Sequence, residues 1–420
     1  MNDVNRRSQG SGAVKTIVPA HRLSVSCIIP PHLLQKLMDS PEKAVRDAAL
    51  NSLLATTLLR GERSVRALSF AAASPGAGRR TVYDCRRSRN LARARVARTE
   101  NGSAAGDSSV NRAFDGLGKT REFYKEVFER DSIDGRGMRL NGFVHYGSRY
   151  QNAFWDGQQM VFGDGDGVIF DDFTKSLDVI GHELAHGVTE HTANLEYHVQ
   201  PGALNESMSD VFGSLVKQWS LNQDASEADW LIGADLFTPA IGADALRSMK
   251  APGTAYDNPT LGRDPQPDHL DRYENLEDTE EGDWGGVHIN SGIPNKAFYL
   301  AATNIGGNAW DAPGHIWYES LKASTATTKF QEFADTTHSK AGQLYGPGSS
   351  EQKAVAAAWR EVGLRIAGVA VSSSDKDKDK GKNRPAPEGD SLAELTKQIE
   401  ALSGQMKILT KDVAALKARK

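Results

Sequence analysis

The sequence predicts an α+β protein with a β-rich N-terminal lobe, an α-helical C-terminal lobe and a C-terminal coiled-coil helix. The stretch from about 80 to 175 is strand-like and contains several Asp-Gly and Asn-Gly turns, whereas 176–368 is mostly helical in character. The 420 residues suffice for two or three domains. The predicted parts are a disordered start with a short separate piece (1–75), the β-rich lobe (76–180), the helical lobe (181–370), a linker (371–390) and the coiled-coil helix (391–420).

The composition is that of an ordinary globular protein and excludes some classes of partner. The net charge is −4 and 25% of the residues are charged, so the chain has no global nucleic-acid footprint. A run of arginines between 79 and 98 is predicted to be a solvated strand face. No stretch approaches the ~20 apolar residues of a membrane span. Cys27 and Cys85 are too few for a disulfide framework.

The N-terminal residues predict no secretory signal. Residues 1–8 are partly basic, but no apolar run of about 7–15 residues follows them. We therefore expect synthesis in the cytoplasm, and secretion by a non-classical route stays open.

The rest of the first part divides into four predicted segments. Residues 1–22 are polar and are predicted to be disordered. A compact apolar piece follows at 27–37, and then a helix from about Pro41 to Leu59. The small residues at 71–78 predict a linker or a cleavage zone.

The C-terminal residues predict an oligomerising coiled coil behind a polar linker. Ser391 and Glu394 form a capping box. The apolar residues are spaced alternately three and four apart, as in a heptad repeat: Leu392, Leu395, Ile399, Leu402, Met406, Leu409, Val413 and Leu416. This pattern favours a parallel homodimer. A trimer, or docking of the helix on the rest of its own chain, is the alternative.

A metal-binding pattern opens the helical part of the chain. His182 and His186 are four residues apart in His-Glu-Leu-Ala-His, so both imidazoles share one helix face. Together with Glu206 they supply three ligands and leave a fourth position for water, as in a catalytic Zn²⁺ site. Glu183 lies between the ligands, where it can accept a proton from that water. The sequence therefore predicts a zinc endopeptidase rather than a surface helix with solvated side chains.

Two further residues are expected to orient the histidines, because a ligating imidazole needs a partner on its other ring nitrogen. Asp210, on the same predicted helix as the glutamate ligand, is suited to His182, and Asn205 is a candidate for His186. A solvated helix carboxylate is the alternative reading of Asp210.

Three blocks occur in the order found in the thermolysin family of zinc metalloproteases, which the sequence resembles: 152–155 (Asn-Ala-Phe-Trp), 182–186 with Glu206, and 285–292 (Gly-Gly-Val-His-Ile-Asn-Ser-Gly). The resemblance covers roughly 110–368 and implies the thermolysin-like two-lobe fold. The piece with Cys27, Pro30 and Pro31 resembles the short propeptide of the protealysin-like branch of that family.

The resemblance also implies roles in catalysis. Tyr197 and His288 match the donors that stabilise the oxyanion, and removal of one such donor typically costs about 2.7–4 kcal/mol. Asp283 matches the carboxylate that keeps that imidazole protonated and oriented. A plain loop histidine is the alternative for His288.

Substrate-binding residues follow from the same resemblance. Asn152 and the Ala153 backbone resemble the groups that pair with an extended substrate. Arg247 resembles the arginine that grips a substrate carbonyl and supports Glu206. Three residues match positions that line the pocket just past the scissile bond: Phe170, Val179 and Leu246. Such an apolar pocket implies a preference for an apolar residue on the leaving side. All three could equally be core residues.

One departure from the family concerns calcium. Many members hold two calcium ions beside the zinc helices in a cluster of carboxylates. Asp178 and Asp229 match that cluster, but Lys217, Leu231 and Ala234 stand at its other positions. Because each calcium ion needs about 6–8 oxygen ligands, we expect the double site to be absent.

The N-terminal piece is predicted to inhibit the enzyme until it is removed. Pro30-Pro31 is stiff and extended, and Ile29 and Leu33 are candidates to enter the apolar pocket. Cys27 could give a thiolate to the metal, but a small buried hydrophobe is the favoured role.

We therefore expect a neutral zinc endopeptidase that acts on proteins or peptides and is made as an autoprocessed proenzyme. A catalytically silent zinc-fold binding protein, oligomerised by its tail, is the alternative from another class, and intact Glu183, Tyr197 and His288 argue against it. A zinc exopeptidase is a second alternative. The edge at Asn152 and Ala153, which continues a substrate on both sides, argues for internal cleavage.

Overall fold

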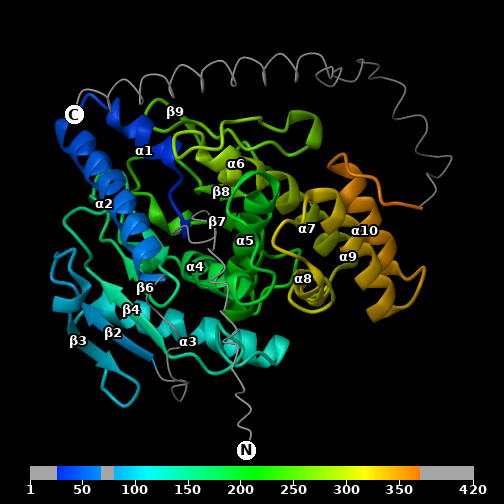
Figure 1. The fold of residues 1–420 in the computed structure, drawn as a ribbon, viewed down its shortest axis with the longest axis horizontal. Helices are drawn as coiled ribbons and strands as arrows, with labels where there is room; N and C mark the ends of the chain where they lie inside the picture. The colour runs from blue at the N-terminus through cyan, green and yellow to red at the C-terminus, as the bar shows by residue number, and fades with distance from the viewer. Residues whose placement is uncertain (1–25, 68–79, 369–420) are drawn as a thin grey trace, which may run out of the picture. The chain divides into compact units, whose positions relative to one another are not determined.

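The computed structural model describes residues 26–67 and 80–368 (Figure 1). The expected disordered start, the cleavage zone at 71–78, the linker and the coiled coil at 391–420 lie outside the described residues. Within the described part, a six-stranded sheet with flanking helices is followed by a mainly helical lobe. No helix of this part is both long and apolar enough to cross a membrane.

The sheet has the strand order β1-β5-β6-β4-β2-β3. Strands β2, β4 and β6 run parallel to one another, and the remaining pairs are antiparallel. The strands are β1 (Ser26–Cys27), β2 (Arg80–Asp84), β3 (Arg95–Thr99), β4 (Leu140–Val144), β5 (Ala153–Trp155) and β6 (Met160–Phe162). The N-terminal segment thus contributes the edge strand β1, which covers the backbone groups of β5.

Two helices follow β1 and pack on the same unit. Helix α1 (Pro31–Met38) begins with proline at its first position, where the missing N–H is not needed. Helix α2 (Lys43–Ala67) covers the helix expected from about Pro41 to Leu59 and continues beyond it. Leu33, Leu34 and Leu37 belong to the main core cluster, so the segment is joined to the catalytic part by apolar burial.

A long helix, α3 (Ser108–Phe128), lies against the sheet in a stretch that was expected to be mainly strands. The Asp107 carboxylate caps it by accepting from the N–H of Ser109 at 2.8 Å. The Asp115-Gly116 pair suggests a turn, yet it lies inside the helix. A Cβ at Gly116 would lie 2.5 Å from Cδ1 of Ile180, so glycine permits close packing with the next helix.

The second lobe consists of helices joined by loops and two small sheets. Its helices are α4 (Leu177–Glu190), α5 (Val199–Leu221), α6 (Asp283–Asn290), α7 (Gly292–Ile305), α8 (Ala312–Ala323), α9 (Phe330–Tyr345) and α10 (Ser350–Glu361). The two-stranded sheets pair β7 (Leu231–Ile232) with β8 (Arg247–Ser248) and β9 (Asp257–Asn258) with β10 (Gly262–Arg263). The acidic stretch 264–282 is a long loop with one 3₁₀ turn at Leu270–Arg272.

Helices α4 and α5 approach each other closely at two glycines. A Cβ at Gly181 would lie 3.1 Å from Cα of Gly213. A Cβ at Gly213 would lie 2.4 Å from the carbonyl oxygen of Asp178 and 2.9 Å from the backbone nitrogen of His182. Larger residues at either position would push the helices apart.

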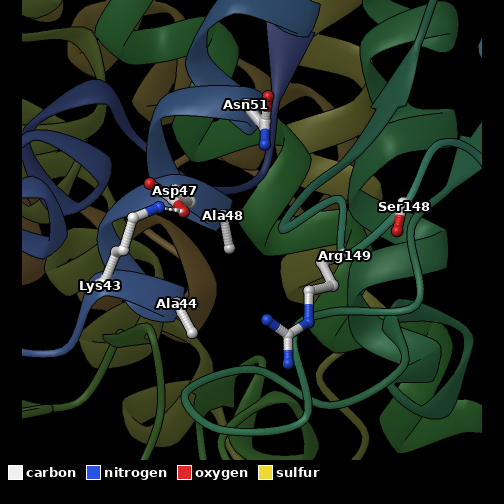
Figure 2. Close-up of a pocket in the computed structure, with 7 residues that line it drawn as sticks. All are labelled: Lys43, Ala44, Asp47, Ala48, Asn51, Ser148 and Arg149. Carbon is white, nitrogen blue, oxygen red and sulfur yellow. Dashed lines mark hydrogen bonds and ion pairs between the residues drawn. The ribbon is translucent and has the colours of Figure 1, made fainter.

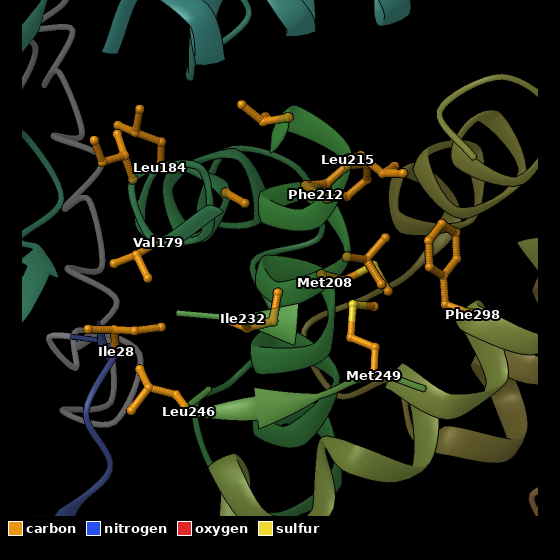
Figure 3. Packing of buried hydrophobic residues seen from close by; sticks show 14 of the residues in the cluster. Ile28, Val179, Leu184, Met208, Phe212, Leu215, Ile232, Leu246, Met249 and Phe298 are labelled. Carbon is orange, nitrogen blue, oxygen red and sulfur yellow. The ribbon is translucent and has the colours of Figure 1, made fainter. Parts of the chain in front are cut away.

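Apolar side chains around this contact fix the two helices in the core. Figure 3 shows Val179 and Leu184 of α4 and Met208, Phe212 and Leu215 of α5, all within one buried cluster. Each such side chain contributes about 1.5–3 kcal/mol when fully buried. The core therefore holds the residues that follow on these helices in one arrangement.

Candidate active site

Helix α4 turns both histidines of the metal-binding pattern to one point. His182 and His186 are separated by one helical turn, and their Nε2 atoms lie 3.1 Å apart. Both side chains are buried. Burial lowers the pKa of His186 to about 3, so the neutral form that can ligate a metal is favoured.

Helix α5 adds the carboxylate of Glu206. Its Oε2 lies 3.5 Å from Nε2 of His182, and its Oε1 lies 3.5 Å from Nε2 of His186. The ligand atoms of the three side chains all lie within 4.8 Å of one another. Among the described residues no donor bonds to Oε2 of Glu206, and a buried oxygen of this kind calls for a cation. Two imidazoles and one carboxylate fit Zn²⁺.

The other ring nitrogens of both histidines have partners. Nδ1 of His182 lies 2.8 Å from Oδ1 of Asp210, and Nδ1 of His186 lies 2.9 Å from Oδ1 of Asn205. Ser209 also lies 3.0 Å from Nδ1 of His186, a contact that the sequence did not suggest. These partners turn the Nε2 atoms toward the metal position.

Asp210 connects the metal ligands to Arg247. The guanidinium donates to both carboxylate oxygens through Nε and Nη2, each at 2.8 Å, and Asn295 donates a third bond at 2.8 Å. Burial opposes ionisation of Asp210, but Arg247 and His182 outweigh it and hold the pKa of that carboxyl well below its usual range. Arg247 was expected to support Glu206, whereas its direct partner is Asp210. Asn295 was not foreseen.

Glu183 lies beside the metal ligands and strand β5. Its Oε2 accepts a hydrogen bond from the backbone N–H of Trp155 at 3.0 Å. Burial raises the pKa of Glu183 well above its ordinary value, and the nearby charge of Glu206 adds to that effect. A carboxyl with a raised pKa is suited to accept and return a proton near neutral pH.

His288 and Tyr197 meet on the opposite side of Glu206. Nε2 of His288 lies 3.2 Å from the Tyr197 hydroxyl, which also donates to Glu206. Oδ1 of Asp283 lies 2.5 Å from Nδ1 of His288, and Oδ2 accepts from the His288 backbone N–H at 2.8 Å. Burial disfavours the imidazolium, but Asp283 and Glu206 outweigh burial and raise the pKa of His288 to about 9.

A left-handed turn at the start of α6 aims His288 into the cleft. Trp284, Gly285 and Gly286 have φ angles of 53°, 79° and 76°, a region that residues other than glycine seldom adopt. At Gly285 a Cβ would also lie 2.9 Å from Cγ2 of Val199. The Gly-Gly pair of the third sequence block therefore serves this turn.

The N-terminal segment lies in the cleft, held by the groups assigned to substrate. The N–H of Ile28 donates to the Ala153 carbonyl at 3.3 Å, and the N–H of Ile29 donates to Oδ1 of Asn152 at 3.0 Å. Arg247 Nη1 donates to the Ile28 carbonyl at 3.2 Å. An extended chain is thus gripped from both sides, which blocks access to the metal position.

Ile28 lies between two of the residues expected to line the apolar pocket. Figure 3 draws it between Val179 and Leu246, and all three belong to the main core cluster. Ile29 and Leu33 belong to the same cluster. Phe170 is fully buried and stacks on Phe237, with ring centroids 5.1 Å apart.

Cys27 presents its backbone to the catalytic groups and its thiol to a hydrophobic cluster. Its carbonyl oxygen lies 3.0 Å from Nε2 of His288. Its side chain is buried in a second cluster with Tyr150 and Phe154. The group of potential metal ligands found among the described residues does not include this thiol, so the geometry favours the role of a small buried hydrophobe. Pro30 lies just before α1, and Pro31 starts it.

A separate cavity of about 370 Å³ lies between α2 and the loop before β5 (Figure 2). Its lining includes Lys43, Asp47 and Arg149, and Lys43 pairs with Asp47 at 2.5 Å. None of the catalytic groups lines it. The cavity therefore marks a polar gap in the contact between the N-terminal segment and the rest of the chain.

Lys217 pairs with the two aspartates that match the family's calcium cluster. Nζ of Lys217 lies 2.8 Å from Oδ2 of Asp229 and 3.3 Å from Oδ2 of Asp178. Burial disfavours the ammonium, but the two carboxylates outweigh burial and raise the pKa of Lys217. The positive charge there takes the place that a cation would need.

The docked segment should loosen in acid because of His32. This side chain of α1 lies 3.3 Å from the Tyr256 hydroxyl, and burial lowers its pKa from 6.5 to about 4, with Arg247 and His288 opposing Asp283. Folding thus favours neutral His32, so its contribution is complete above pH 6.5 and is lost as the pH falls toward 4. At roughly 1.4 kcal/mol per pKa unit, we expect a loss of up to about 3 kcal/mol.

Urea unfolding of the Glu183→Ala protein, with and without His32→Gln, measures this effect between pH 7 and pH 4. The difference in free energy of unfolding between the two proteins should change across that window. Acid effects on the rest of the molecule are the same in both proteins and cancel. Parallel curves would show that His32 does not titrate as described.

Comparisons with known proteins agree with this geometry. The family descriptions "Thermolysin metallopeptidase, catalytic domain" and "Thermolysin metallopeptidase, alpha-helical domain" match residues 77–190 and 193–364. An "Extracellular metalloprotease" of Pectobacterium carotovorum subsp. carotovorum is 43% identical over 344 residues, which are 81% of this chain and 97% of that protein. "Protease PrtS" of a Photorhabdus species is 44% identical over 347 residues, with 81% and 92% covered.

A solved structure extends the similarity to a precursor. The "Precursor of Protealysin, Metalloproteinase from Serratia proteamaculans" superposes with a TM-score of 0.72 at 47% identity, and the match covers 81% of this chain and 99% of that one. The similarity therefore reaches beyond the zinc motif to most of the chain. This chain belongs to the thermolysin family of zinc metallopeptidases and is similar to its protealysin-like members.

Proposed function

We propose that this neutral zinc endopeptidase cuts internal peptide bonds at the site formed by His182, His186 and Glu206. Glu183 would serve as the proton acceptor, and an apolar residue would be preferred on the leaving side of the bond. The observation that carries the proposal is the N-terminal segment, an extended chain whose backbone is held across the ligand cluster. A peptide substrate presents the same backbone groups.

Each group has a task that its position suits. When bound, the zinc ion supplies Lewis acidity that lowers the pKa of a water molecule and polarises the peptide carbonyl. Glu183 accepts a proton from water and returns it to the leaving nitrogen. His288 and Tyr197 donate to the carbonyl oxygen as negative charge develops on it, with Asp283 keeping His288 protonated.

Substrate would be held by the groups that now hold the segment. Ala153 and Asn152 would pair with its backbone as a neighbouring strand does. Arg247, fixed by Asp210, would donate to the carbonyl that follows the scissile bond. Val179 and Leu246 would line an apolar pocket that favours Leu, Ile or Phe on the leaving side.

We also propose that the chain is made as a proenzyme. Residues 26–67 fill the cleft through backbone pairing and buried leucines, so a substrate must compete with a segment of the same chain. Removal of this segment by a cut near 71–78, made by the enzyme itself, would open the site. The Pectobacterium relative is named an extracellular metalloprotease, and release from the cell is proposed for this chain as well.

The rival functions differ in simple assays. A catalytically silent binding protein would leave casein intact with or without a metal chelator, whereas the proposal expects cleavage that the chelator abolishes. An exopeptidase would release single residues from the ends of casein peptides. The contacts on both sides of the Cys27–Ile28 bond favour internal cleavage.

Replacement of Glu183 should separate catalysis from metal binding. In Glu183→Ala the three ligands remain, so zinc content should stay near one ion per chain. Because general acid–base catalysis typically contributes about 10²- to 10⁴-fold, casein cleavage should fall by that factor. Metal analysis and initial rates on the same sample measure both.

Glu190→Ala, at the other end of α4, is the matched control and should keep its activity. The Glu183→Ala protein should also remain uncut near 71–78, as mass spectrometry of its N-terminus would show. A zinc-loaded Glu183→Ala protein that still cleaves casein would refute the assigned role.

Calcium should add little stability. Lys217 already neutralises Asp178 and Asp229, and a calcium pair would need about 6–8 oxygens for each ion. Thermal melts with zinc held constant and calcium varied should therefore overlap. A rise of many degrees with calcium would contradict this assignment.

We further propose that 391–420 joins two chains as a parallel coiled coil. Its heptad pattern supports this, and a trimer is the alternative. Light scattering should give twice the chain mass for the full chain and a monomer mass for a version ending at Val371, with equal specific activity. Monomer masses for both would end the idea.

A further inference from the structure

We propose that the Cys27–Ile28 peptide bond is itself a substrate of this site, cut within its own chain before the N-terminal segment leaves. The inference rests on the proposed peptidase function. It identifies one bond of this chain, separate from the cleavage zone at 71–78. Its product would be a chain that begins at Ile28 and keeps its cleft filled.

The N-terminal segment pairs with β5 in a register that runs through this bond. In the antiparallel pairing of β1 with β5, Ser26 lies opposite Trp155 and Cys27 lies opposite Phe154. The pairing continues past the strand, because the N–H of Ile28 donates to the Ala153 carbonyl at 3.3 Å. The backbone is therefore extended through the bond in question, as a cleavable peptide must be.

The carbonyl of the bond lies at His288, one of the two groups assigned to the oxyanion. The Cys27 oxygen is 3.0 Å from Nε2 of His288, and the Tyr197 hydroxyl is 3.2 Å from that same nitrogen. Neighbouring carbonyls of the segment have other partners: that of Ile28 accepts from Arg247 at 3.2 Å, and that of Ile29 faces Asn152 at 3.5 Å. Only one of these three carbonyls thus meets the groups assigned to catalysis.

The nitrogen of the bond is held by the same strand that holds the proton carrier. In β5, the Ala153 carbonyl accepts from the N–H of Ile28 at 3.3 Å, and the N–H of Trp155 donates to Oε2 of Glu183 at 3.0 Å. On the leaving side, the Ile28 side chain is drawn between Val179 and Leu246, as the proposed preference requires (Figure 3). The carbonyl, the nitrogen and the Ile28 side chain therefore all lie where the corresponding groups of a cleavable substrate are proposed to lie.

The reaction is an ordinary hydrolysis. The oxygen of one water molecule bonds to the Cys27 carbonyl carbon, and the Cys27–Ile28 C–N bond breaks. Glu183 passes both protons of the water, one after the other, to the Ile28 nitrogen. The products are a Cys27 carboxylate and an Ile28 ammonium group, and no other reactant is needed.

After the cut, residues from Ile28 onward remain attached to the catalytic part. Ile29 keeps its bonds to Asn152, Thr56 lies 3.0 Å from the Tyr150 hydroxyl, and the N–H of Gln151 donates to Ser52 at 2.9 Å. Helices α1 and α2 also keep their buried apolar residues. In contrast, β1 has only two paired residues before the bond. The cut would release the first part while inhibition persists.

The experiment follows the chain itself after zinc is added to metal-free protein. Intact mass and N-terminal peptide analysis should reveal a chain that begins at Ile28 and a peptide that ends at Cys27. The first-order rate constant, and therefore the half-time of the cut, should not depend on protein concentration, because the bond lies at the site of its own chain. Casein cleavage after full maturation is measured on the same preparation.

Two variants make the assignment specific. Ile28→Asp places a charge in the apolar pocket and should slow the cut at least about tenfold, whereas Ile28→Leu should keep it. Circular dichroism shows whether each variant is folded. If Ile28→Asp is not folded, Ile28→Leu decides, because it should still be cut. Cys27→Ala should keep the cut and lower the mass of the released peptide.

The possible results separate the proposed peptidase function from the proposed cut at Cys27–Ile28. A preparation that cleaves casein but never yields an Ile28 terminus overturns this inference and leaves the peptidase function standing. A half-time that shortens in proportion to protein concentration overturns cleavage within the same chain. Failure to cleave either casein or this bond would refute the proposed function and the inference with it.

Discussion

The close contact between α4 and α5 is the constraint on which the site depends. His182 and His186 lie on one helix and Glu206 on the other, so the ligand atoms meet only if the helix backbones approach at short range. Gly181 and Gly213 allow this approach, since side chains there would overlap the facing backbone. The apolar residues on both helices then hold the contact in a single arrangement.

Asp210 extends this constraint from the metal to the substrate. It orients His182 and at the same time fixes Arg247, whose remaining donor grips the Ile28 carbonyl. Removal of one partner from a buried charge pair typically costs about 3–5 kcal/mol, because the other charge is left without compensation. The ligand geometry and the grip on the peptide chain are therefore linked through one carboxylate.

The residues of the metal cluster could be predicted because their signal is local. A helix places residues four apart on one face, so His182 and His186 followed from spacing alone, and the need for a partner on each ring pointed to Asp210 and Asn205. The two-lobe fold followed from turn and helix patterns joined to the family resemblance. These rules operate within a few helical turns.

What escaped prediction depends on contacts between distant parts of the chain. The backbone N–H of Trp155 leaves no trace in a side-chain pattern, and Asn295 meets Asp210 only because α7 packs nearby. The position of Ile28 between Val179 and Leu246 depends on strand register, which a slip of one residue would change. Helix α3 was missed because the glycine of an Asp-Gly pair served helix packing.

The central claim, that glycine contact between α4 and α5 creates the metal site, is tested most directly by zinc titration of Gly213→Ala. A Cβ there meets the backbone of Asp178 and His182, so we expect about 1–3 kcal/mol of lost stability and a zinc affinity at least about tenfold weaker, near 1.4 kcal/mol. Gly106→Ala, where nothing among the described residues lies within 4 Å of the added Cβ, should bind zinc like the unaltered protein. A folded Gly213→Ala protein with unchanged zinc affinity would contradict the account.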